Sequence, residues 1–220
     1  MSKIELIQGD CLEEMSDISG KFIIVSDPPF NIGYKYKSYK DNKKEDEYYE
    51  WLYKIFGNNP QVLIHYPESL YKYSFQSGMF PNKVISWVYN SNTGKQHRLI
   101  SWWGCKPDFR KIRQPYKNLN DKRIKARIAA GKTGAKLYDW WEINQVKNVS
   151  KEKTAHPCQI PEEVIRRIIL ITAKPNDVII DVFGGSGTTS KVANELRFDT
   201  ISYETDETYC DIMAERVLFL

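Results

Sequence analysis

The chain has 220 residues, of which 41% are hydrophobic and 27% charged, and its formal net charge is +4. This length fits a single domain that buries its own core, so we expect one domain over residues 1–220. No apolar signal core opens the chain and no apolar run approaches the roughly 20 residues of a membrane span, so we expect a cytoplasmic protein without membrane contact. The four widely spaced cysteines suggest neither a disulfide framework nor a zinc site, so no metal is expected.

The positive charge is concentrated in the middle of the chain. Residues 95–153 contain 16 Lys and Arg against 5 Asp and Glu, a net of +11, whereas the remainder contains 16 against 23, a net of −7. A basic segment of this kind is typical of a polyanion-binding surface, because each neutralised phosphate releases counterions. Charge alone leaves open a merely solvated basic face.

The first strong element is the apolar run at residues 22–25, which predicts a short buried strand. The motif Asp27-Pro28-Pro29-Phe30 follows it. The Asp27 carboxylate and the Pro28 carbonyl can each accept an N–H bond, the prolines fix the backbone, and the Phe30 ring offers a stacking face. This combination suits an aromatic ring with an exocyclic amino group, although an isolated Asp-Pro-Pro is also explained as a turn.

Aromatic and basic residues alternate in the next segment, residues 34–40. Such a loop can follow a nucleic-acid backbone and stack on bases, and an exposed edge strand is the other interpretation. Its candidate nucleic-acid contacts are Tyr34, Lys35 and Lys37. Beyond it, the pattern predicts a helix over residues 47–56 and short strands at 62–64 and 84–88.

Glycine clusters at residues 90–94 and 131–134 bracket an insertion-like central region. Arginines in this region can read guanine edges or hold phosphates. Asp121 is a typical N-cap, and the helix that it predicts has Arg123 and Arg127 on one face. The candidate nucleic-acid contacts of this region are Arg110, Lys111, Arg113, Arg123 and Arg127.

Helices and strands alternate after the insertion. The pattern predicts a helix at residues 162–173, a strand at 178–182, a helix at 188–196, a strand at 200–203 and a helix at 207–218. Such alternation predicts an α/β, doubly wound domain, with a mostly parallel sheet and helices on both faces.

A glycine-rich turn runs from Asp181 to Thr189, between a predicted strand and a predicted helix. Its missing side chains let a ligand approach the backbone, and the helix N-terminus offers free N–H groups. The turn is neither a P-loop nor a dinucleotide fingerprint. Glu204 ends the next predicted strand, 23 residues after Asp181, where an acidic side chain meets ribose hydroxyls in nucleotide-binding sheets.

Taken together, these motifs resemble the DNA amino-methyltransferases that use S-adenosylmethionine, in the beta-group order, where the catalytic motif precedes the cofactor motif. The matching stretches are residues 8–12, 26–31, 156–161, and 181–189 with 203–206. Phe30 stands where Tyr is commoner, and Ile160 where Lys is usual. The resemblance implies a Rossmann-like methyltransferase fold, with a target-recognition insertion at about 102–136.

The same resemblance implies a methyl transfer to the N6 amino group of adenine in double-stranded DNA, with the base flipped out. The implied catalytic residues are Asp27, Pro28, Pro29 and Phe30. The implied contacts to S-adenosylmethionine are Asp10 at the adenine amino group, Glu204 at the ribose hydroxyls, and His156, Gln159, Asp181, Phe183, Gly184, Gly185, Ser186, Gly187, Thr188 and Thr189 at the methionine half. Cys11 and Asp206 are further implied cofactor contacts. Two further partners come into consideration for a restriction–modification enzyme: a second copy of this chain and a cognate restriction endonuclease.

Several other functions stay open. Cytosine N4 methylation uses the same scaffold, although Ser-Pro-Pro is commoner there than Asp-Pro-Pro. An inactive DNA-binding subunit and a nicotinamide-dependent oxidoreductase are further alternatives. The Pro157-Cys158 dipeptide suggests carbon-5 methylation of cytosine, because enzymes of that class use a Pro-Cys nucleophile. The Asp27–Phe30 motif would be redundant in such an enzyme. A zinc deaminase is poorly supported because its H-x-E and P-C-x-x-C pattern is missing.

Overall fold

The computed structural model describes residues 2–15 and 20–218. Most of its strands form one eight-stranded sheet in the order β1-β10-β9-β2-β3-β5-β4-β8. These strands are β1 (Ile4–Gln8), β2 (Phe22–Ser26), β3 (Gln61–His65), β4 (Lys83–Val88), β5 (His97–Trp103), β8 (Trp140–Glu142), β9 (Val178–Asp181) and β10 (Thr200–Glu204). The helices are α1 (Cys11–Glu14), α2 (Glu45–Phe56), α3 (Pro67–Ser77), α4 (Lys122–Ala129), α5 (Glu162–Thr172), α6 (Thr188–Glu195) and α7 (Glu207–Leu218).

The sheet is mostly parallel, as predicted. Strand β5 runs antiparallel to its neighbours β3 and β4, and the other pairs of this sheet are parallel. Strands β2 and β3 lie in the middle and are almost wholly buried, which explains their unbroken apolar runs.

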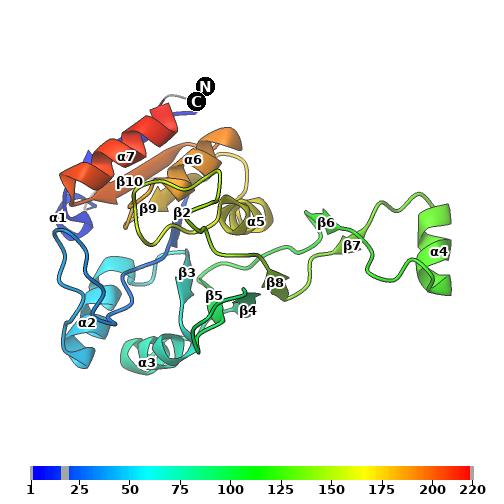
Figure 1. The fold of residues 1–220 in the computed structure, drawn as a ribbon, viewed down its shortest axis with the longest axis horizontal. Coiled ribbons are helices and arrows are strands. Elements are labelled where there is room, and N and C mark those ends of the chain that lie inside the picture. Colours follow the sequence, from blue (N-terminus) through cyan, green and yellow to red (C-terminus); the bar gives the residue numbers. More distant parts are fainter. Residues whose placement is uncertain (1, 16–19, 219–220) are drawn as a thin grey trace.

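Helices cover both faces of the sheet (Figure 1). Ile23 and Val25 of β2 pack in one core with residues of α5 and α6, whereas Ile24 points the other way, into a core with residues of α2 and α3. This alternation along one strand produces the doubly wound arrangement, because successive side chains of a strand point to opposite faces. No helix among the described residues is both long and apolar enough to cross a membrane.

The strand order brings distant motifs to one edge. Strands β1, β10, β9 and β2 are parallel neighbours, so their carboxyl ends lie side by side. The chain leaves β9 for α6 on one face and leaves β2 for α2 on the other face. The boundary between β9 and β2 is therefore a topological switch point, where α/β sheets bind ligands.

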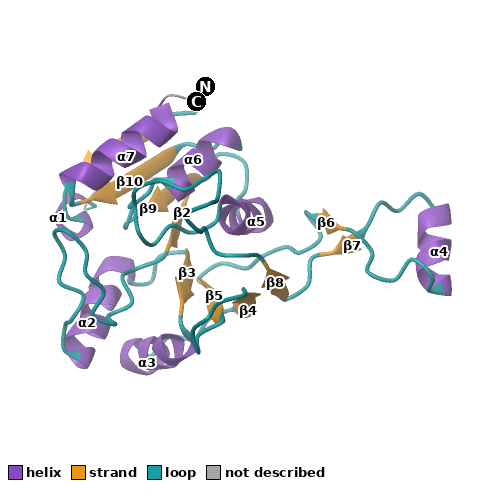
Figure 2. Ribbon diagram, viewed as in Figure 1, coloured by secondary structure: helices purple, strands orange, loops and turns teal. Residues whose placement is uncertain are grey.

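An arm extends from the body between β5 and β8 (Figure 1). It consists mainly of loops, with the short ladder of β6 (Arg113–Gln114) and β7 (Ala135–Lys136) and the helix α4 (Figure 2). The arm starts slightly later than the expected boundary at 102, because Trp102 and Trp103 are fully buried in β5. The predicted cap is confirmed: Asp121 accepts hydrogen bonds from the backbone N–H groups of Arg123 and Ile124.

Candidate active site

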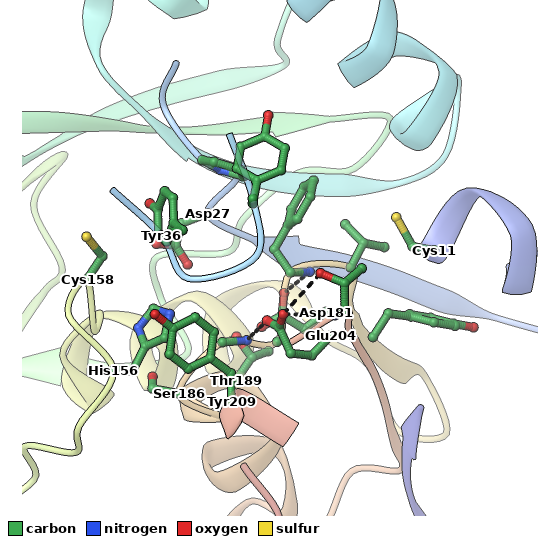
Figure 3. Close-up of a pocket in the computed structure, with 18 of the residues that line it drawn as sticks. Cys11, Asp27, Tyr36, His156, Cys158, Asp181, Ser186, Thr189, Glu204 and Tyr209 are labelled. Carbon is green, nitrogen blue, oxygen red and sulfur yellow. Dashed lines mark hydrogen bonds between the residues drawn. The ribbon is translucent and has the colours of Figure 1, made fainter. Parts of the chain in front are cut away.

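A cavity of about 310 Å³ lies at the switch-point edge of the sheet. The residues of its wall that the sequence motifs single out are Asp10, Cys11, Asp27, Pro29, His156, Asp181, Phe183, Gly184, Gly185, Ser186, Thr188, Thr189 and Glu204. The candidate residues that are not part of the wall are Pro28, Phe30, Gln159, Gly187 and Asp206. Figure 3 shows Asp27 at one side of the view and Cys11 at the other, with Asp181 and Glu204 between them.

The glycine turn forms the floor of this cavity because side chains are excluded from it. Gly185 has a φ of +49°, and a Cβ there would lie 3.0 Å from Nε2 of His156. Gly187 has a φ of +71°, and a Cβ there would lie 2.9 Å from Cγ of Met213. Both positions therefore need the left-handed backbone and the small size of glycine. The turn brings its backbone against the ligand space.

Glu204 fixes this turn from the end of β10. Its Oε2 accepts a hydrogen bond from the Gly185 N–H (2.8 Å), and its Oε1 accepts from the N–H groups of Thr205 (2.8 Å) and Asp206 (2.9 Å). Each carboxylate oxygen has about two acceptor positions, and among the described residues Oε2 accepts only from the Gly185 N–H, so Oε2 still has capacity for a ligand hydroxyl. Asp206 itself accepts from the backbone N–H of Tyr209 at the start of α7.

Asp181 links the two strands at the switch point. Its buried carboxylate accepts hydrogen bonds from the Ser26 hydroxyl (2.6 Å) and from the Phe183 N–H (3.1 Å). Burial raises the pKa of Asp181, and the hydrogen bond from Ser26 opposes that rise. Because Ser26 precedes Asp27, this bond sets the end of β2 directly against the start of the glycine turn.

Asp27 is a partly buried carboxyl group at the end of β2. Burial raises its pKa well above the usual range, and the negative charge of Asp181 raises it further. The positive charge of Arg98 on β5 acts in the opposite direction. Asp27 is therefore a strong hydrogen-bond acceptor that faces the ligand space.

Phe30 is not part of the cavity wall and is partly exposed. Its ring centroid lies 4.9 Å from those of His65 and Tyr66, and the guanidinium carbon of Arg98 lies 4.7 Å from it. The short segment from Asp27 to Phe30 is therefore supported by strands β3 and β5, which the sequence motif does not indicate.

The loop after Phe30 folds back to the cavity. The buried carboxylate of Asp41 accepts hydrogen bonds from three backbone N–H groups, those of Asn31, Ile32 and Tyr34, at 2.7–3.0 Å. The loop residues that reach the cavity wall are Tyr36, Ser38, Tyr39 and Lys43. Tyr36 and Tyr39 thus line the cavity, which the aromatic–basic alternation of this loop did not indicate.

Exposed side chains remain on that loop. Tyr34, Lys35 and Lys37 are exposed, so their contact with nucleic acid stays a prediction.

His156 and Gln159 have different environments. His156 is buried beside Gly185 and Tyr209, and burial together with the positive charge of Lys153 lowers its pKa to about 4. Its Nδ1 atom is buried and has no hydrogen-bond partner among the described residues. The Gln159 amide is already used within its own loop, where it accepts from the Thr154 N–H and donates to the Glu152 carbonyl. Gln159 therefore supports the loop and lies outside the wall.

The arm carries most of the remaining candidates. Arg110 and Arg123 pair with acidic neighbours but stay exposed, and Arg113 and Arg127 are exposed as well. The Lys111 ammonium donates to the Ala173 carbonyl (2.6 Å), which attaches the base of the arm to the body. Four of these five basic side chains are therefore exposed and accessible to a polyanion.

Several wall residues had not been selected from the sequence. They are Gly9, Tyr36, Ser38, Tyr39, Lys43, Trp51, Cys158, Ile160, Val182, Tyr203, Thr205 and Tyr209. Among them, Trp51 was the residue that sequence reasoning could best have selected, because it is a tryptophan in an aromatic-rich predicted helix. Its ring centroid lies 5.4 Å from that of Phe183. Within residues 2–15 and 20–218 no group of three or more His, Cys, Asp or Glu side chains is placed to hold a metal ion.

Known proteins resemble this chain over nearly its whole length. The N6_N4_Mtase family model, described as DNA methylase, matches residues 22–215. The type II methyltransferase M.BglII of Bacillus subtilis is 30% identical over 244 residues, which cover 94% of this chain and 67% of that protein.

Two solved structures share the fold. The cytosine-N4-specific PvuII DNA methyltransferase has a TM-score of 0.70 at 19% identity, and the match covers 98% of this chain and 86% of that one. A complex of M1.HpyAVI with SAM has a TM-score of 0.60 at 20% identity, with 97% and 99% covered.

Proposed function

The chain belongs to the DNA methylase family that the N6_N4_Mtase model describes, and within it we propose that the protein transfers a methyl group from S-adenosylmethionine to the N6 amino group of adenine in DNA. One observation carries this proposal: Asp27 shares a single cavity with the glycine turn and Glu204. An acceptor for an amino group and a cradle for a nucleoside-like cofactor thus face each other.

The residues of the cavity fit S-adenosylmethionine. The turn lines the cavity at Gly184 and Gly185, where a Cβ at Gly185 would crowd the His156 ring, and the buried Nδ1 of His156 has no hydrogen-bond partner among the described residues. Glu204 has acceptor capacity for ribose hydroxyls, and Asp10, whose neighbour Gly9 is hydrogen-bonded to the Glu204 carbonyl, is part of the same wall for the adenine amino group. When bound, the cofactor supplies a methyl group that is already activated by its sulfonium.

Asp27 and the Pro28 carbonyl prepare the nucleophile in this proposal. The lone pair of an exocyclic amino group is delocalised into the base ring, so it must be localised on nitrogen before transfer. Two acceptors that each hold one amino proton favour this geometry. The raised pKa of Asp27 also makes its carboxylate a better acceptor for the proton that leaves after transfer. Positioning and electrostatics then suffice, without a covalent enzyme intermediate.

The target base must leave the duplex to reach this cavity. Extrusion costs a few kcal/mol, which hydrogen bonds to the amino group and stacking on an aromatic ring offset. Phe30 is our candidate for the stacking residue. Its ring is already supported by His65, Tyr66 and Arg98, so it is ordered before a base arrives.

The modified base identifies the reaction. Purified protein is incubated with S-adenosylmethionine and unmethylated DNA, and the nucleosides are analysed by mass spectrometry. We expect N6-methyladenine, because Asp-Pro-Pro at positions 27–29 is the adenine pattern of the family that the motifs resemble. N4-methylcytosine is the second candidate, because a cytosine-N4-specific enzyme shares this fold. Neither product, despite demonstrated cofactor binding, favours an inactive subunit.

The arm is our proposed DNA interface. Arg123 and Arg127 lie on α4, a helix with no buried residue. A second, basic hollow of about 470 Å³ is lined by residues of α4 and of the β6–β7 ladder, among them Arg113 and Arg127, and by Arg110. Phosphate contacts of this kind release counterions and make binding depend on salt.

Loss of these contacts gives a measurable effect. The double variant Arg123→Gln with Arg127→Gln should weaken DNA binding and reduce the slope of log K against log salt by about 1.8, because each phosphate contact contributes about 0.9. Fluorescence anisotropy at several salt concentrations measures this slope. The control replaces the exposed Lys21 and Lys54 of the body with glutamine. Equal slopes in the two double variants would contradict the assignment.

The pKa of Asp27 predicts how activity depends on pH. The carboxylate form is the acceptor, so kcat/KM should fall as the pH decreases through the raised pKa. Arg98→Met removes the positive charge that lowers this pKa, so the acid limb should move to higher pH. Paired pH–rate profiles check the direction, and an acid limb that stays in place or moves to lower pH would refute the assigned role of Arg98.

A homodimer and a cognate restriction endonuclease are further proposals. The recognition region expected at residues 102–136 is short, so a dimer would extend the recognised site. Light scattering of the protein, alone and with DNA, tests this: a monomer in both cases counts against the dimer.

A further inference from the structure

Two buried polar side chains form a chain of hydrogen bonds behind the Asp27–Phe30 segment. Tyr48 lies on α2 and is 1% exposed, and His65 ends β3 and is 4% exposed. The Tyr48 hydroxyl donates to the Pro29 carbonyl (Oη to O, 2.6 Å) and lies 2.8 Å from Nε2 of His65. The backbone N–H of Tyr66 donates to Nδ1 of His65 (3.0 Å). This series of hydrogen bonds therefore connects the end of β3 to the proline pair.

The donor and the acceptor of each hydrogen bond in this series follow from the proton positions. Nδ1 of His65 accepts from a backbone N–H, so it carries no proton. The neutral ring then carries its proton on Nε2, which donates to the Tyr48 hydroxyl. That hydroxyl uses its own proton on the Pro29 carbonyl. Burial, together with the positive charges of Arg98 and Lys95, lowers the pKa of His65 to about 3, so the ring stays neutral near pH 7.

The Pro29 carbonyl is a sensitive point of the segment. Neither Pro28 nor Pro29 has a backbone N–H, so the segment cannot fix its own peptide planes by donating hydrogen bonds. The proline ring fixes φ at Pro29 but leaves ψ free. When Tyr48 holds the carbonyl of Pro29, that remaining rotation is restricted. The preceding peptide, which carries the Pro28 carbonyl, is then oriented as well.

The same histidine also supports the aromatic residue of the motif. The His65 ring lies 4.9 Å from Phe30, and the Tyr48 ring lies 6.2 Å from His65. Tyr48 is also close to Trp51, a residue of the cavity wall, with ring centroids 6.0 Å apart. One buried pair thus contacts the segment at both Pro29 and Phe30.

We propose that Tyr48 and His65 are positioning residues for the methyl transfer, because together they hold the Pro29 carbonyl and so orient the acceptors at Asp27 and Pro28 toward the amino group. The proposal rests on the proposed transfer to an amino group, and it holds equally for adenine N6 and cytosine N4. Neither residue touches the base or the cofactor in this role.

Tyr48→Phe is the decisive variant, because it removes one oxygen atom and both of its hydrogen bonds while it keeps the ring. Misplacement of reacting groups by about 1 Å can cost about 100-fold in rate. We therefore expect the single-turnover rate constant of methyl transfer to fall about 10- to 100-fold. The dissociation constants of S-adenosylmethionine and DNA should not change, because the lost bonds touch neither.

Tyr73→Phe is the matched control. Tyr73 is similarly buried, at 2% exposure, but it lies on α3 and packs against Trp103, away from the catalytic segment. Urea unfolding of both variants measures the folded fraction, so that a rate loss is not mistaken for unfolding. Equal transfer rates in the two folded variants would overturn the proposal.

Replacements of His65 test the other half of the chain. The amide nitrogen of His65→Gln can donate to the Tyr48 hydroxyl, whereas His65→Leu has a similar volume and no donor. We expect glutamine to retain clearly more transfer activity than leucine at equal cofactor affinity. Equal losses in both variants would overturn the role of the hydrogen bond. Absence of any methylated nucleoside from the wild-type protein and from Tyr73→Phe would instead refute the proposed function, and the positioning role with it.

Discussion

Asp27→Ala is expected to lower the rate of methyl transfer by about 1,000-fold or to below detection. Removal of one preorganised hydrogen-bonding group costs about 100- to 1,000-fold in rate, and this variant also removes the negative charge of the carboxylate. The alanine side chain cannot accept an amino proton, and the Pro28 carbonyl alone holds only one. The measurement is single-turnover formation of methylated nucleosides with saturating DNA and cofactor.

Cofactor binding should survive this change. Asp27 lies at one side of the cavity, away from Glu204 (Figure 3). The hydrogen bond between Glu204 and the Gly185 N–H does not involve Asp27 and stays intact in the variant. Calorimetric titration with S-adenosylmethionine should give the wild-type affinity. Asp46→Ala, an exposed acid in the first turn of α2, is the control. Near-normal turnover in Asp27→Ala would refute the catalytic role.

Glu204→Ala is expected to weaken the binding of S-adenosylmethionine by about 10- to 100-fold. Hydrogen bonds to a charged group contribute about 1.5–3 kcal/mol, and each 1.4 kcal/mol corresponds to about tenfold in affinity. The variant loses the acceptor for the ribose and also releases the Gly185 N–H, which shapes the glycine turn. Both effects act in the same direction.

Titration calorimetry and the KM for the cofactor should agree on this loss. Transfer at saturating cofactor should recover much of the wild-type rate, because Glu204 does not touch the amino group in this mechanism. Glu207→Ala, three residues further along and exposed, is the matched control. An unchanged dissociation constant in Glu204→Ala would show that the ribose lies elsewhere.

Most of the central fold could be predicted from the sequence. The apolar runs at residues 22–25, 62–64 and 178–182 are strands, and the helical spacing at 162–173 is a helix. These elements are buried on one face or both, so their patterns are strong. Strand β5 and helix α3 were not predicted. Ser101 interrupts the apolar run of β5, and α3 buries only Ser69, Leu70 and Tyr73.

The candidate site was predictable where its residues form compact motifs. Asp27 with its two prolines, and the glycines from 184 to 187, carry chemistry that neighbours in the chain already define. The position of Tyr36 and Tyr39 in the cavity wall could not be predicted, because aromatic–basic alternation does not indicate which side of a loop faces a cavity. Asp41 decides that by binding three backbone N–H groups.

The sequence by itself therefore determined most of the central elements and the motifs, because periodicity and motif chemistry are local properties of the chain. The tertiary structure alone decided that Asp27 and Asp181 line the same cavity, because this depends on β2 and β9 becoming neighbours at the switch point. It also decided that Tyr48 and His65 hold the Pro29 carbonyl. Hydrogen bonds between distant segments depend on how helices and strands pack, and no local pattern encodes that partnership.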